Sequence, residues 1–231
     1  MTVRVPPDTL AAILVAAGKS VRFGRDKLLE TLGDRRVISW PVEAFLSRAD
    51  VACVVVVTPA GDDELSRALE GALPRDPRIR YTRGGETRAH SVRVGAAAVP
   101  EDVAWLAIHD AARPLVSQAL IDRTFAAALA HGAAVPALPV PTTIKEADGS
   151  RVLRTLPRRA LWATQTPQIM RRQALLEAFD RCALPFDQIT DDVQLLELAG
   201  AEVRLVEGES RNLKLTEPVD LDLARLWLNG R

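Results

Sequence analysis

The feature that most constrains the fold is a regular alternation of short apolar runs with longer helical patterns. The run at 51–57 is almost continuous in valine, as expected for a strand that is buried on both faces. Alternation of this kind predicts an α/β fold with a mostly parallel sheet covered by helices. The expected strands are 11–17, 51–58, 79–82, 103–109, 133–138 and 202–207. The expected helices are 37–48, 62–72, 86–98, 118–130, 172–181, 191–199 and 218–228, with Thr190 and Thr216 as N-caps of the last two.

The first expected strand ends in small residues and a glycine, Gly18, followed by the cations Arg22 and Lys27. Small residues let the backbone approach a ligand closely, and the cations suit a polyphosphate. A Walker A loop is excluded because Ile13 stands where its first glycine is needed, and a dinucleotide fingerprint is excluded because Ser20 replaces its second glycine. The stretch therefore indicates either a nucleotide triphosphate site or an ordinary tight turn with surface charges.

Composition limits the remaining possibilities. The chain has 231 residues, which suffices for one large domain, and we expect a single domain over 1–231. Its 30 basic and 30 acidic side chains cancel, which argues against broad binding of nucleic acid or membrane surfaces. Cys53 and Cys182 lie far apart and indicate neither a disulfide framework nor a zinc site, and Cys53 is expected in the core. Without a signal sequence or a membrane-length apolar run, the expected location is cytoplasmic.

One segment, 139–161, interrupts the alternation. Two short extended stretches flank a turn at Asp148-Gly149, which predicts a β-hairpin. Its faces carry too few apolar residues to form a core, and a lone hairpin is marginally stable in water. We therefore expect it to pack on another subunit; the alternative is a surface hairpin that lies back on its own domain.

Four loops follow the carboxyl ends of expected strands, where open parallel sheets bind ligands. They are 18–27, 83–91, 110–114 and 208–214. Asp110 is the expected magnesium ligand, since one carboxylate with phosphate oxygens and water makes a normal site; the alternatives are a helix N-cap or an ion pair with Arg113. His109 has no evident nucleophile partner and is not expected to act as a base. Backbone groups at Gly84-Gly85, with Ser91, could contact a base or ribose, or could simply begin a helix.

Seven motifs in a characteristic order carry a family resemblance. In chain order they are AAGKSVR with Lys27 after it, GGETRAHSV, HDAARP, PVPTTIK, RALWATQTPQ, ITDD and RNLKLT. With these motifs the chain resembles the 2-C-methyl-D-erythritol 4-phosphate cytidylyltransferases of the non-mevalonate isoprenoid pathway. The resemblance covers nearly the whole chain. It implies a Rossmann-like nucleotidyltransferase fold and a homodimer, in which the hairpin at 139–161 is an arm that completes the partner's active site.

The resemblance also implies a reaction and the residues that serve it. CTP and 2-C-methyl-D-erythritol 4-phosphate would give 4-diphosphocytidyl-2-C-methyl-D-erythritol and pyrophosphate, with Mg²⁺. Arg22, Lys27, Arg158 and Lys214 would be the catalytic cations. Nucleotide binding would fall to Ala16, Ala17, Gly18, Gly85, Glu86, Ser91, Asp110 and Ala111. Substrate binding would fall to Asp110, Arg113, Thr143, Arg158, Thr190 and Lys214, with Thr143 and Arg158 serving the neighbouring subunit.

The chemistry accounts for a site rich in cations. A phosphate monoester has a second pKa of about 6, so it is largely a dianion at neutral pH and needs no general base. The obstacle is repulsion from the triphosphate, which cations and a metal ion must offset. The same set could serve another alcohol phosphate such as ribitol 5-phosphate, or remain in a nucleotide-binding dimer module that has lost catalysis.

The first loop also departs from the family pattern. Ser20 replaces a usual glycine and Phe23 a frequent methionine, while Asp26 and Leu28 flank the lysine in place of proline and glutamine. Glu86 replaces an aspartate in the second loop. Asp26 would be unfavourable beside a triphosphate unless it points away or pairs with an arginine.

Overall fold

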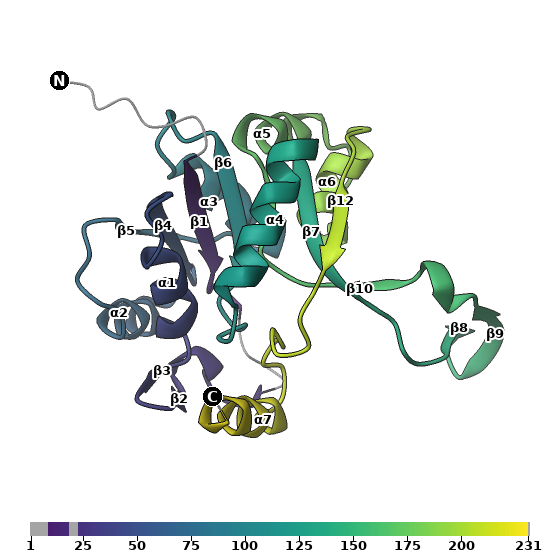
Figure 1. The fold of residues 1–231 in the computed structure, drawn as a ribbon, viewed down its shortest axis with the longest axis horizontal. Helices are drawn as coiled ribbons and strands as arrows, with labels where there is room; N and C mark the ends of the chain where they lie inside the picture. Colours follow the sequence, from purple (N-terminus) through teal and green to yellow (C-terminus); the bar gives the residue numbers. More distant parts are fainter. Residues whose placement is uncertain (1–8, 19–22, 231) are drawn as a thin grey trace.

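A computed structural model describes residues 9–18 and 23–230. Its centre is an eight-stranded sheet with the order β10-β7-β11-β6-β1-β4-β5, in which β12 also pairs with β7 (Figure 1). The strands of this sheet are β1 (Leu10–Val15), β4 (Val51–Thr58), β5 (Ile79–Arg83), β6 (Trp105–Asp110), β7 (Ala133–Pro139), β10 (Trp162–Thr164), β11 (Gln168–Arg171) and β12 (Arg204–Glu207).

The prediction of a mostly parallel sheet is confirmed. Strand β1 pairs in parallel with β4 and β6, β4 pairs with β5, and β7 pairs with β12. Strands β10 and β11 were not predicted, and both are antiparallel to their neighbours. Each has at most four residues, which is too short for a periodic pattern, and β11 reaches its place between β6 and β7 only through tertiary pairing.

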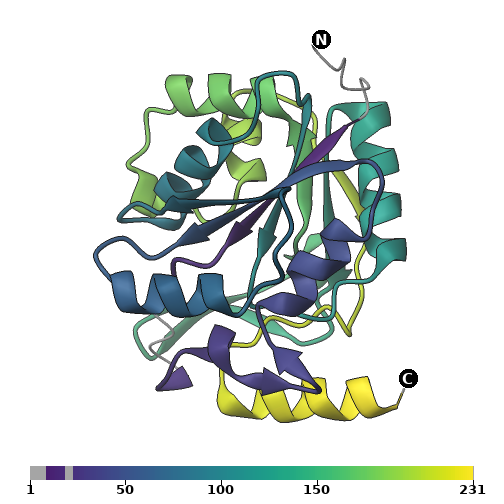
Figure 2. The ribbon, with the colours of Figure 1, turned by 90° about the vertical axis from the view of Figure 1, so that its left-hand side faces the viewer.

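The helices cover both faces of the sheet (Figure 2). Alternate residues of β1 point to opposite faces: Leu14 packs in one core cluster and Ile13 in the other. The first cluster includes residues of α1 and α4, such as Phe45 and Phe125, and the second includes residues of α3, α5 and α6. The helices are α1 (Ser39–Leu46), α2 (Asp63–Gly71), α3 (Arg88–Ala97), α4 (Gln118–His131), α5 (Arg172–Arg181), α6 (Val193–Leu198) and α7 (Pro218–Asn229).

Both predicted threonine caps are wrong by one or two residues. Helix α6 is preceded by Asp192 and α7 by Glu217, which forms a capping box with Asp220. The hydroxyl of Thr190 instead bonds Gln194 Oε1, and that of Thr216 bonds Asp220 Oδ2. Each threonine thus supports the segment that leads into the helix, but neither is the cap itself.

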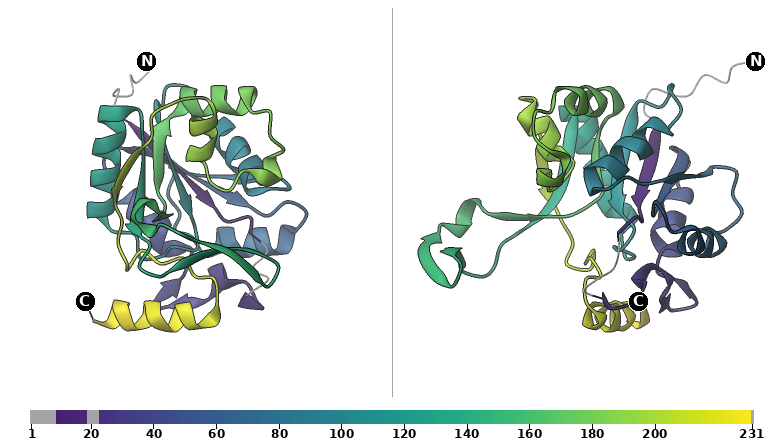
Figure 3. Two further views of the ribbon diagram at one scale, coloured as in Figure 1. Left: turned by 90° about the vertical axis from the view of Figure 1, so that its right-hand side faces the viewer. Right: turned by 180° about the vertical axis from the view of Figure 1, so that it is seen from behind.

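The predicted hairpin is confirmed as β8 (Ile144–Asp148) and β9 (Arg151–Leu156), with Gly149 at a φ of 55° in its turn. It projects away from the body of the molecule and does not lie back on it (Figures 1 and 3). Two of its apolar side chains are largely exposed, Val152 at 57% and Leu153 at 52%. We call the segment 139–161 the arm.

A smaller layer lies beyond the carboxyl edge of the sheet (Figure 1). It comprises η2 (Lys27–Leu29), the two-stranded hairpin of β2 (Thr31–Leu32) and β3 (Arg35–Arg36), and α7, which contacts β2. Arg225 of α7 donates from Nη2 to the carbonyl of Thr31 at 3.1 Å. This layer holds Lys27 on a short helical element next to the sheet.

Two expectations from composition can be compared with the described residues. Cys53 is buried and Cys182 half-buried, and both are free thiols. Among the described residues, no helix is both long enough and apolar enough to cross a membrane.

Candidate active site

Strand register brings the four predicted loops to one edge of the sheet. Val15 at the end of β1 pairs with Val57 on one side and with Asp110 on the other. Beyond β4, the amide of Gly84 donates to the carbonyl of Thr58 at 2.8 Å. At the far side of the sheet, the amide of Gly208 donates in the same way to Ala137.

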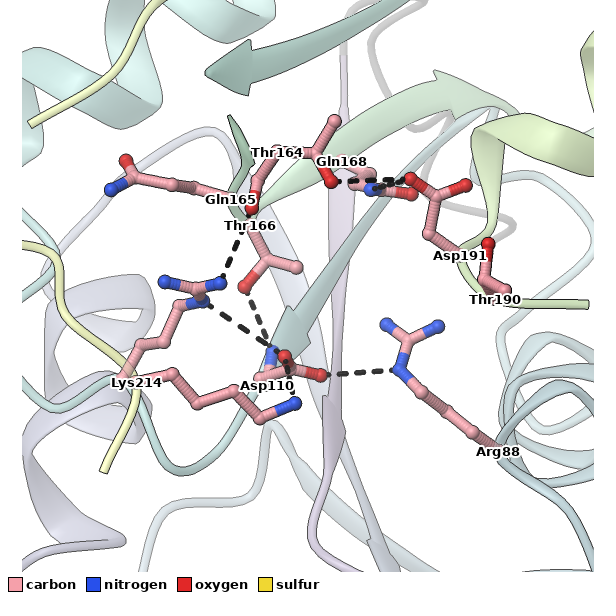
Figure 4. A pocket seen from close by; sticks show the side chains of 10 residues that line it. Arg88, Asp110, Thr164, Gln165, Thr166, Gln168, Thr190, Asp191 and Lys214 are labelled. Atoms are coloured by element: carbon pink, nitrogen blue, oxygen red, sulfur yellow. Dashed lines mark hydrogen bonds and ion pairs between the residues drawn. The ribbon is translucent and has the colours of Figure 1, made fainter. Parts of the chain in front are cut away.

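A pocket opens at this edge beyond the end of β6 (Figure 4). Its lining is almost entirely polar. The residues come from the end of β6 and the loop after it, from the start of α3, from the segment that runs from β10 into β11, and from two loops in the C-terminal half of the chain. The lining residues are Arg88, Asp110, Arg113, Thr164, Gln165, Thr166, Gln168, Thr190, Asp191 and Lys214.

Asp110 is the centre of charge in the pocket. Its Oδ2 lies 2.8 Å from Lys214 Nζ and 3.9 Å from Arg113 Nε, and its Oδ1 lies 3.2 Å from Arg88 Nε. Burial alone would raise the pKa of this carboxyl, but Arg88 and Lys214 outweigh burial and hold the pKa well below its usual range. Asp110 is therefore a carboxylate at any physiological pH. The ion pair with Arg113, one of the alternatives for this residue, exists as part of a larger cluster.

A buried hydrogen-bond chain fixes the backbone of Asp110. Its amide donates to Thr166 Oγ1 at 3.0 Å, and that hydroxyl lies 3.1 Å from Nδ1 of His109. Because the carbonyl of Arg113 can only accept a hydrogen bond, Nε2 of the neutral His109 ring carries the proton, and the hydroxyl of Thr166 donates to Nδ1. Nε2 then donates to the carbonyl of Arg113 at 3.1 Å. Burial lowers the pKa of His109 to about 4, so the ring is neutral and supports the turn, as expected for a histidine that is not a base.

Arg88 links Asp110 to a second buried carboxylate. Its Nη1 and Nη2 donate to the two oxygens of Asp192 at 2.9 and 2.8 Å. Burial works against the charge on Arg88, but Asp192 and Asp110 raise its pKa further above the usual value. The amides of Asp192 and Val193 both donate to Gln168 Oε1, which fixes this segment against β11.

The loop that carries Lys214 is anchored on both sides. Asn212 is fully buried, and its Nδ2 donates to the carbonyl of Thr166 at 2.8 Å while its own carbonyl accepts from Arg113 Nη1 at 2.8 Å. The loop begins close against β7, since a Cβ at Gly208 would lie 2.7 Å from Gln165 Oε1 and 3.0 Å from the backbone of Ala137. Lys214 therefore extends from a rigid loop toward Asp110.

Several of these residues received no role from the sequence alone. Each stands within a motif that carried the resemblance, but nothing in local spacing shows that the motifs meet in space. They are Arg88, Thr164, Gln165, Thr166, Gln168, Asp191, Asp192 and Asn212.

Comparison with known proteins identifies the family. The sequence model of 2-C-methyl-D-erythritol 4-phosphate cytidylyltransferase (IspD) matches residues 10–230. The chain belongs to the 2-C-methyl-D-erythritol 4-phosphate cytidylyltransferase family. The resemblance that the motifs carried is thereby confirmed.

Relatives of known name agree in sequence and structure. The chain is 41% identical to 2-C-methyl-D-erythritol 4-phosphate cytidylyltransferase of Rubrobacter xylanophilus over 223 residues, which are 95% of each chain. It is 42% identical over 227 residues to the bifunctional enzyme IspD/IspF of an Anaeromyxobacter species, covering 96% of this chain and 58% of that enzyme. The crystal structure of the cytidylyltransferase from Thermus thermophilus superposes with a TM-score of 0.76 at 34% identity, covering 94% of this chain and 98% of that one. The chain thus spans little more than half of the bifunctional relatives and nearly all of the others.

The expected nucleotide-binding residues of this cytidylyltransferase-family chain follow the ends of β1, β5 and β6. Ala16 and Ala111 are buried and can offer only backbone groups to a ligand. The amide of Gly85 is bonded to Ser91 Oγ at 3.2 Å, and Ser91 is itself 1% exposed. In this structure the buried hydroxyl of Ser91 supports the loop, whereas Glu86 and Gly18 are exposed.

The first loop is described only in part. Arg22 and Ser20 lie outside the described residues, so the catalytic role expected of Arg22 together with Lys27 stays a prediction. Asp26 caps η2 by accepting from the amide of Leu28 at 2.8 Å, so its carboxylate is engaged by the backbone of its own loop. Two other departures from the family pattern have a packing role: Phe23 and Leu28 are 4% and 3% exposed in the core.

The arm residues of the family pattern do not line this chain's own pocket. Thr143 and Arg158 are exposed on the arm, where Arg158 Nη1 donates to the carbonyl of Pro141 at 2.5 Å. Thr190, in contrast, lines the pocket beside Asp191.

Proposed function

We propose that this chain transfers the cytidylyl group of CTP to 2-C-methyl-D-erythritol 4-phosphate. The products would be 4-diphosphocytidyl-2-C-methyl-D-erythritol, an isoprenoid precursor, and pyrophosphate. The observation that carries the proposal is Asp110 with three cations around it, at the sheet edge where the predicted nucleotide loops also end. Family membership over residues 10–230 supports the same reaction.

The reaction joins two anions. A phosphate oxygen of the acceptor attacks the α-phosphorus of CTP, the new P–O bond forms, and the bond to the β-phosphate breaks to release pyrophosphate. Because the acceptor is a dianion, no residue must remove a proton. The geometry agrees, since His109 is buried and spends both ring nitrogens on hydrogen bonds within the protein.

The pocket cations would bind the acceptor phosphate. Lys214 Nζ extends into the pocket, and Arg113 Nε is buried with no hydrogen-bond partner among the described residues. An unpartnered buried donor is costly unless a ligand oxygen reaches it. Thr190 and Asp191, at the other side of the pocket, would then face the hydroxyl groups of the acceptor.

The donor set also fits a magnesium ion. Asp110 offers hard carboxylate oxygens directly in the pocket, and Mg²⁺ is commonly held by one or two carboxylates together with substrate phosphates. The described residues contain no cluster of three or more metal-ligating side chains, so the substrates would supply the other ligands. When bound, the metal would neutralise phosphate charge, while Lys27, and Arg22 in the segment not described, would face the leaving pyrophosphate.

We also propose that the arm makes the chain a homodimer. The arm projects from the body, exposes Val152 and Leu153, and carries Thr143 and Arg158 away from its own pocket. In a dimer the exposed apolar residues would be covered, and the two polar residues would complete the partner's site.

A pyrophosphate-release assay tests the function. CTP is supplied with 2-C-methyl-D-erythritol 4-phosphate, or with ribitol 5-phosphate, in the presence of Mg²⁺ or of EDTA. Release with the first acceptor and magnesium is expected, and a Lys214→Met variant should lose roughly a hundred- to a thousandfold of that rate. Arg204→Ala is the matched control, since this cation of β12 pairs only with surface groups. Preference for ribitol 5-phosphate, or CTP binding without release, would refute the assignment.

A further inference from the structure

The cations that contact Asp110 differ in how firmly they are held. Lys214 meets Asp110 through a single nitrogen at 2.8 Å, and its side chain is 38% exposed. Arg88 is less exposed, at 26%, and its two terminal nitrogens are committed to Asp192 while Nε contacts Asp110. One cation can leave Asp110 by rotation about its own bonds, and the other cannot move without breaking a bidentate ion pair.

Asp192 is a firm anchor for that pair. Its side chain is 1% exposed, so its charge depends on Arg88 for compensation. Its amide donates to Gln168 Oε1 at 2.9 Å, and Gln168 is itself 1% exposed on β11. The anchor is therefore tied to the sheet through a buried side chain.

We infer that Arg88 is a positioning residue for the transfer reaction and that Asp192 locks it in place. Arg88 stays on Asp110 throughout, while Lys214 exchanges Asp110 for the acceptor phosphate. This inference rests on the proposed function, because it concerns the acceptor phosphate of that reaction.

When the acceptor binds without a metal ion, the exchange requires the fixed cation. If Lys214 leaves Asp110 for a phosphate, the buried carboxylate would lose its nearest partner and strongly oppose the step. Arg88 removes that obstacle because its contact to Oδ1 does not depend on Lys214. The same arginine begins α3, within the predicted loop 83–91, and binds Asp192 next to Thr190 and Asp191. One side chain thus fixes the nucleotide side, the acceptor side and Asp110 relative to each other.

Net charge and positioning predict opposite results for Asp192→Asn. The substitution removes one negative charge near the pocket, so charge alone would improve binding of a phosphate dianion. Loss of the lock instead lets Arg88 shift, and a misplacement of about 1 Å can cost on the order of a hundredfold in rate. We expect kcat to fall roughly tenfold to a hundredfold while the Kd of CTP stays within about threefold. Asp180→Asn is the matched control, since it makes the same charge change in the exposed Arg93–Asp180 pair, which also involves α3.

Arg88→Lys supplies the second test. Lysine keeps the charge but lacks the planar fork that bridges two carboxylates. We expect it to lower kcat as Asp192→Asn does, and the double variant to be no slower than the slower of the two single variants. Asp192→Glu, which restores the carboxylate, should recover most of the rate. Calorimetric titration with 2-C-methyl-D-erythritol 4-phosphate alone, without CTP or metal, should show acceptor binding weakened about tenfold in Arg88→Gln, because Asp110 then retains Lys214.

The outcomes separate the two proposals. A folded Asp192→Asn or Arg88→Lys variant with wild-type kcat overturns the positioning role and leaves the proposed function intact. Absence of pyrophosphate release by the wild-type chain overturns the proposed function instead. If Asp192→Asn does not fold, Arg88→Lys decides: retained turnover overturns the inference, and reduced turnover with an unchanged CTP Kd supports it.

Discussion

His109 should lower the free energy of unfolding of this protein in mild acid. The decrease should begin at a higher pH than the decrease that protonation of the carboxylates causes. The ring is fully buried, and its two nitrogens bond Thr166 and the carbonyl of Arg113. Burial is the main cause of its lowered pKa; the charge of Arg113 adds to it, while Asp110 and the hydrogen bonds oppose it. In the native state the ring therefore stays neutral where an unfolded chain would already bind a proton.

The magnitude follows from the two pKa values. The pKa of His109 is about 4 in the folded protein and 6.5 as a reference. Between these values the unfolded chain binds more protons, so the free energy of unfolding decreases as the pH falls from 6.5 and stops changing below about 4. The complete loss is about 3 kcal/mol, of which about 2 kcal/mol is lost by about pH 5. Asp110 adds a loss only below about pH 3.9, where aspartates of the unfolded chain bind protons.

The assay is denaturant unfolding at several pH values between about 7 and about 4.5, for the wild type and for His109→Gln. Glutamine keeps a donor for the carbonyl of Arg113 but does not titrate. Other groups that titrate in this range are present in both proteins, so subtraction of the two curves leaves the contribution of residue 109. We expect the difference in free energy of unfolding between the wild type and His109→Gln to change by about 2 kcal/mol between about pH 7 and pH 5. Two parallel curves would refute the reasoning, whatever their offset.

Three further predictions concern the loops and the arm. Gly84→Ala places a Cβ 2.8 Å from that of Ala17, so the KM for CTP should rise roughly tenfold while calorimetric acceptor binding is unchanged; an unchanged KM would contradict it. Leu153→Asp on the arm should convert a dimer to monomers in light scattering, and the monomers should keep a cooperative thermal unfolding transition; a persistent dimer would show that the arm is not the contact. Lys27→Ala should stay folded and lose turnover about a hundred- to a thousandfold; near-normal turnover would remove Lys27 from the site.

Much of the fold could be predicted because its signals are local. The valine run of β4 and the alternating faces of β1 follow from the period of a strand, and the helices that cover the sheet follow from theirs. The arm was predicted because turn residues stand between its two extended stretches and because it has no apolar face that could form a core. Strands β10 and β11 were not predicted, because they are short and form only by pairing with β7 and β6. The N-caps of α6 and α7 were predicted wrongly, because a threonine one or two residues before the true N-cap is also a residue type that favours this position.

The candidate site divides in the same way. Asp110 could be proposed because it follows a predicted strand, and parallel strands end at a common edge. Lys214 lies in a loop that also follows a predicted strand, but its role came from the motif RNLKLT that carries the family resemblance. Arg88 could not be proposed, because its partner Asp192 lies 104 residues further along the chain. The bonds of the buried Ser91 hydroxyl to the backbone of Gly85 and Thr87 were not predicted, and its part in nucleotide binding stays a prediction.

The sequence by itself determined the fold class, the arm and the chemical character of the site, since periodicity, turn residues and residue type are properties of short segments. Only the tertiary structure decided that Asp110 contacts three cations from three separate segments, that one of them is locked by Asp192, and that His109 is a buried neutral support. The physical reason is that charges and hydrogen bonds act over a few ångströms in space, and distance along the chain does not specify distance in space until strand register and packing have fixed it.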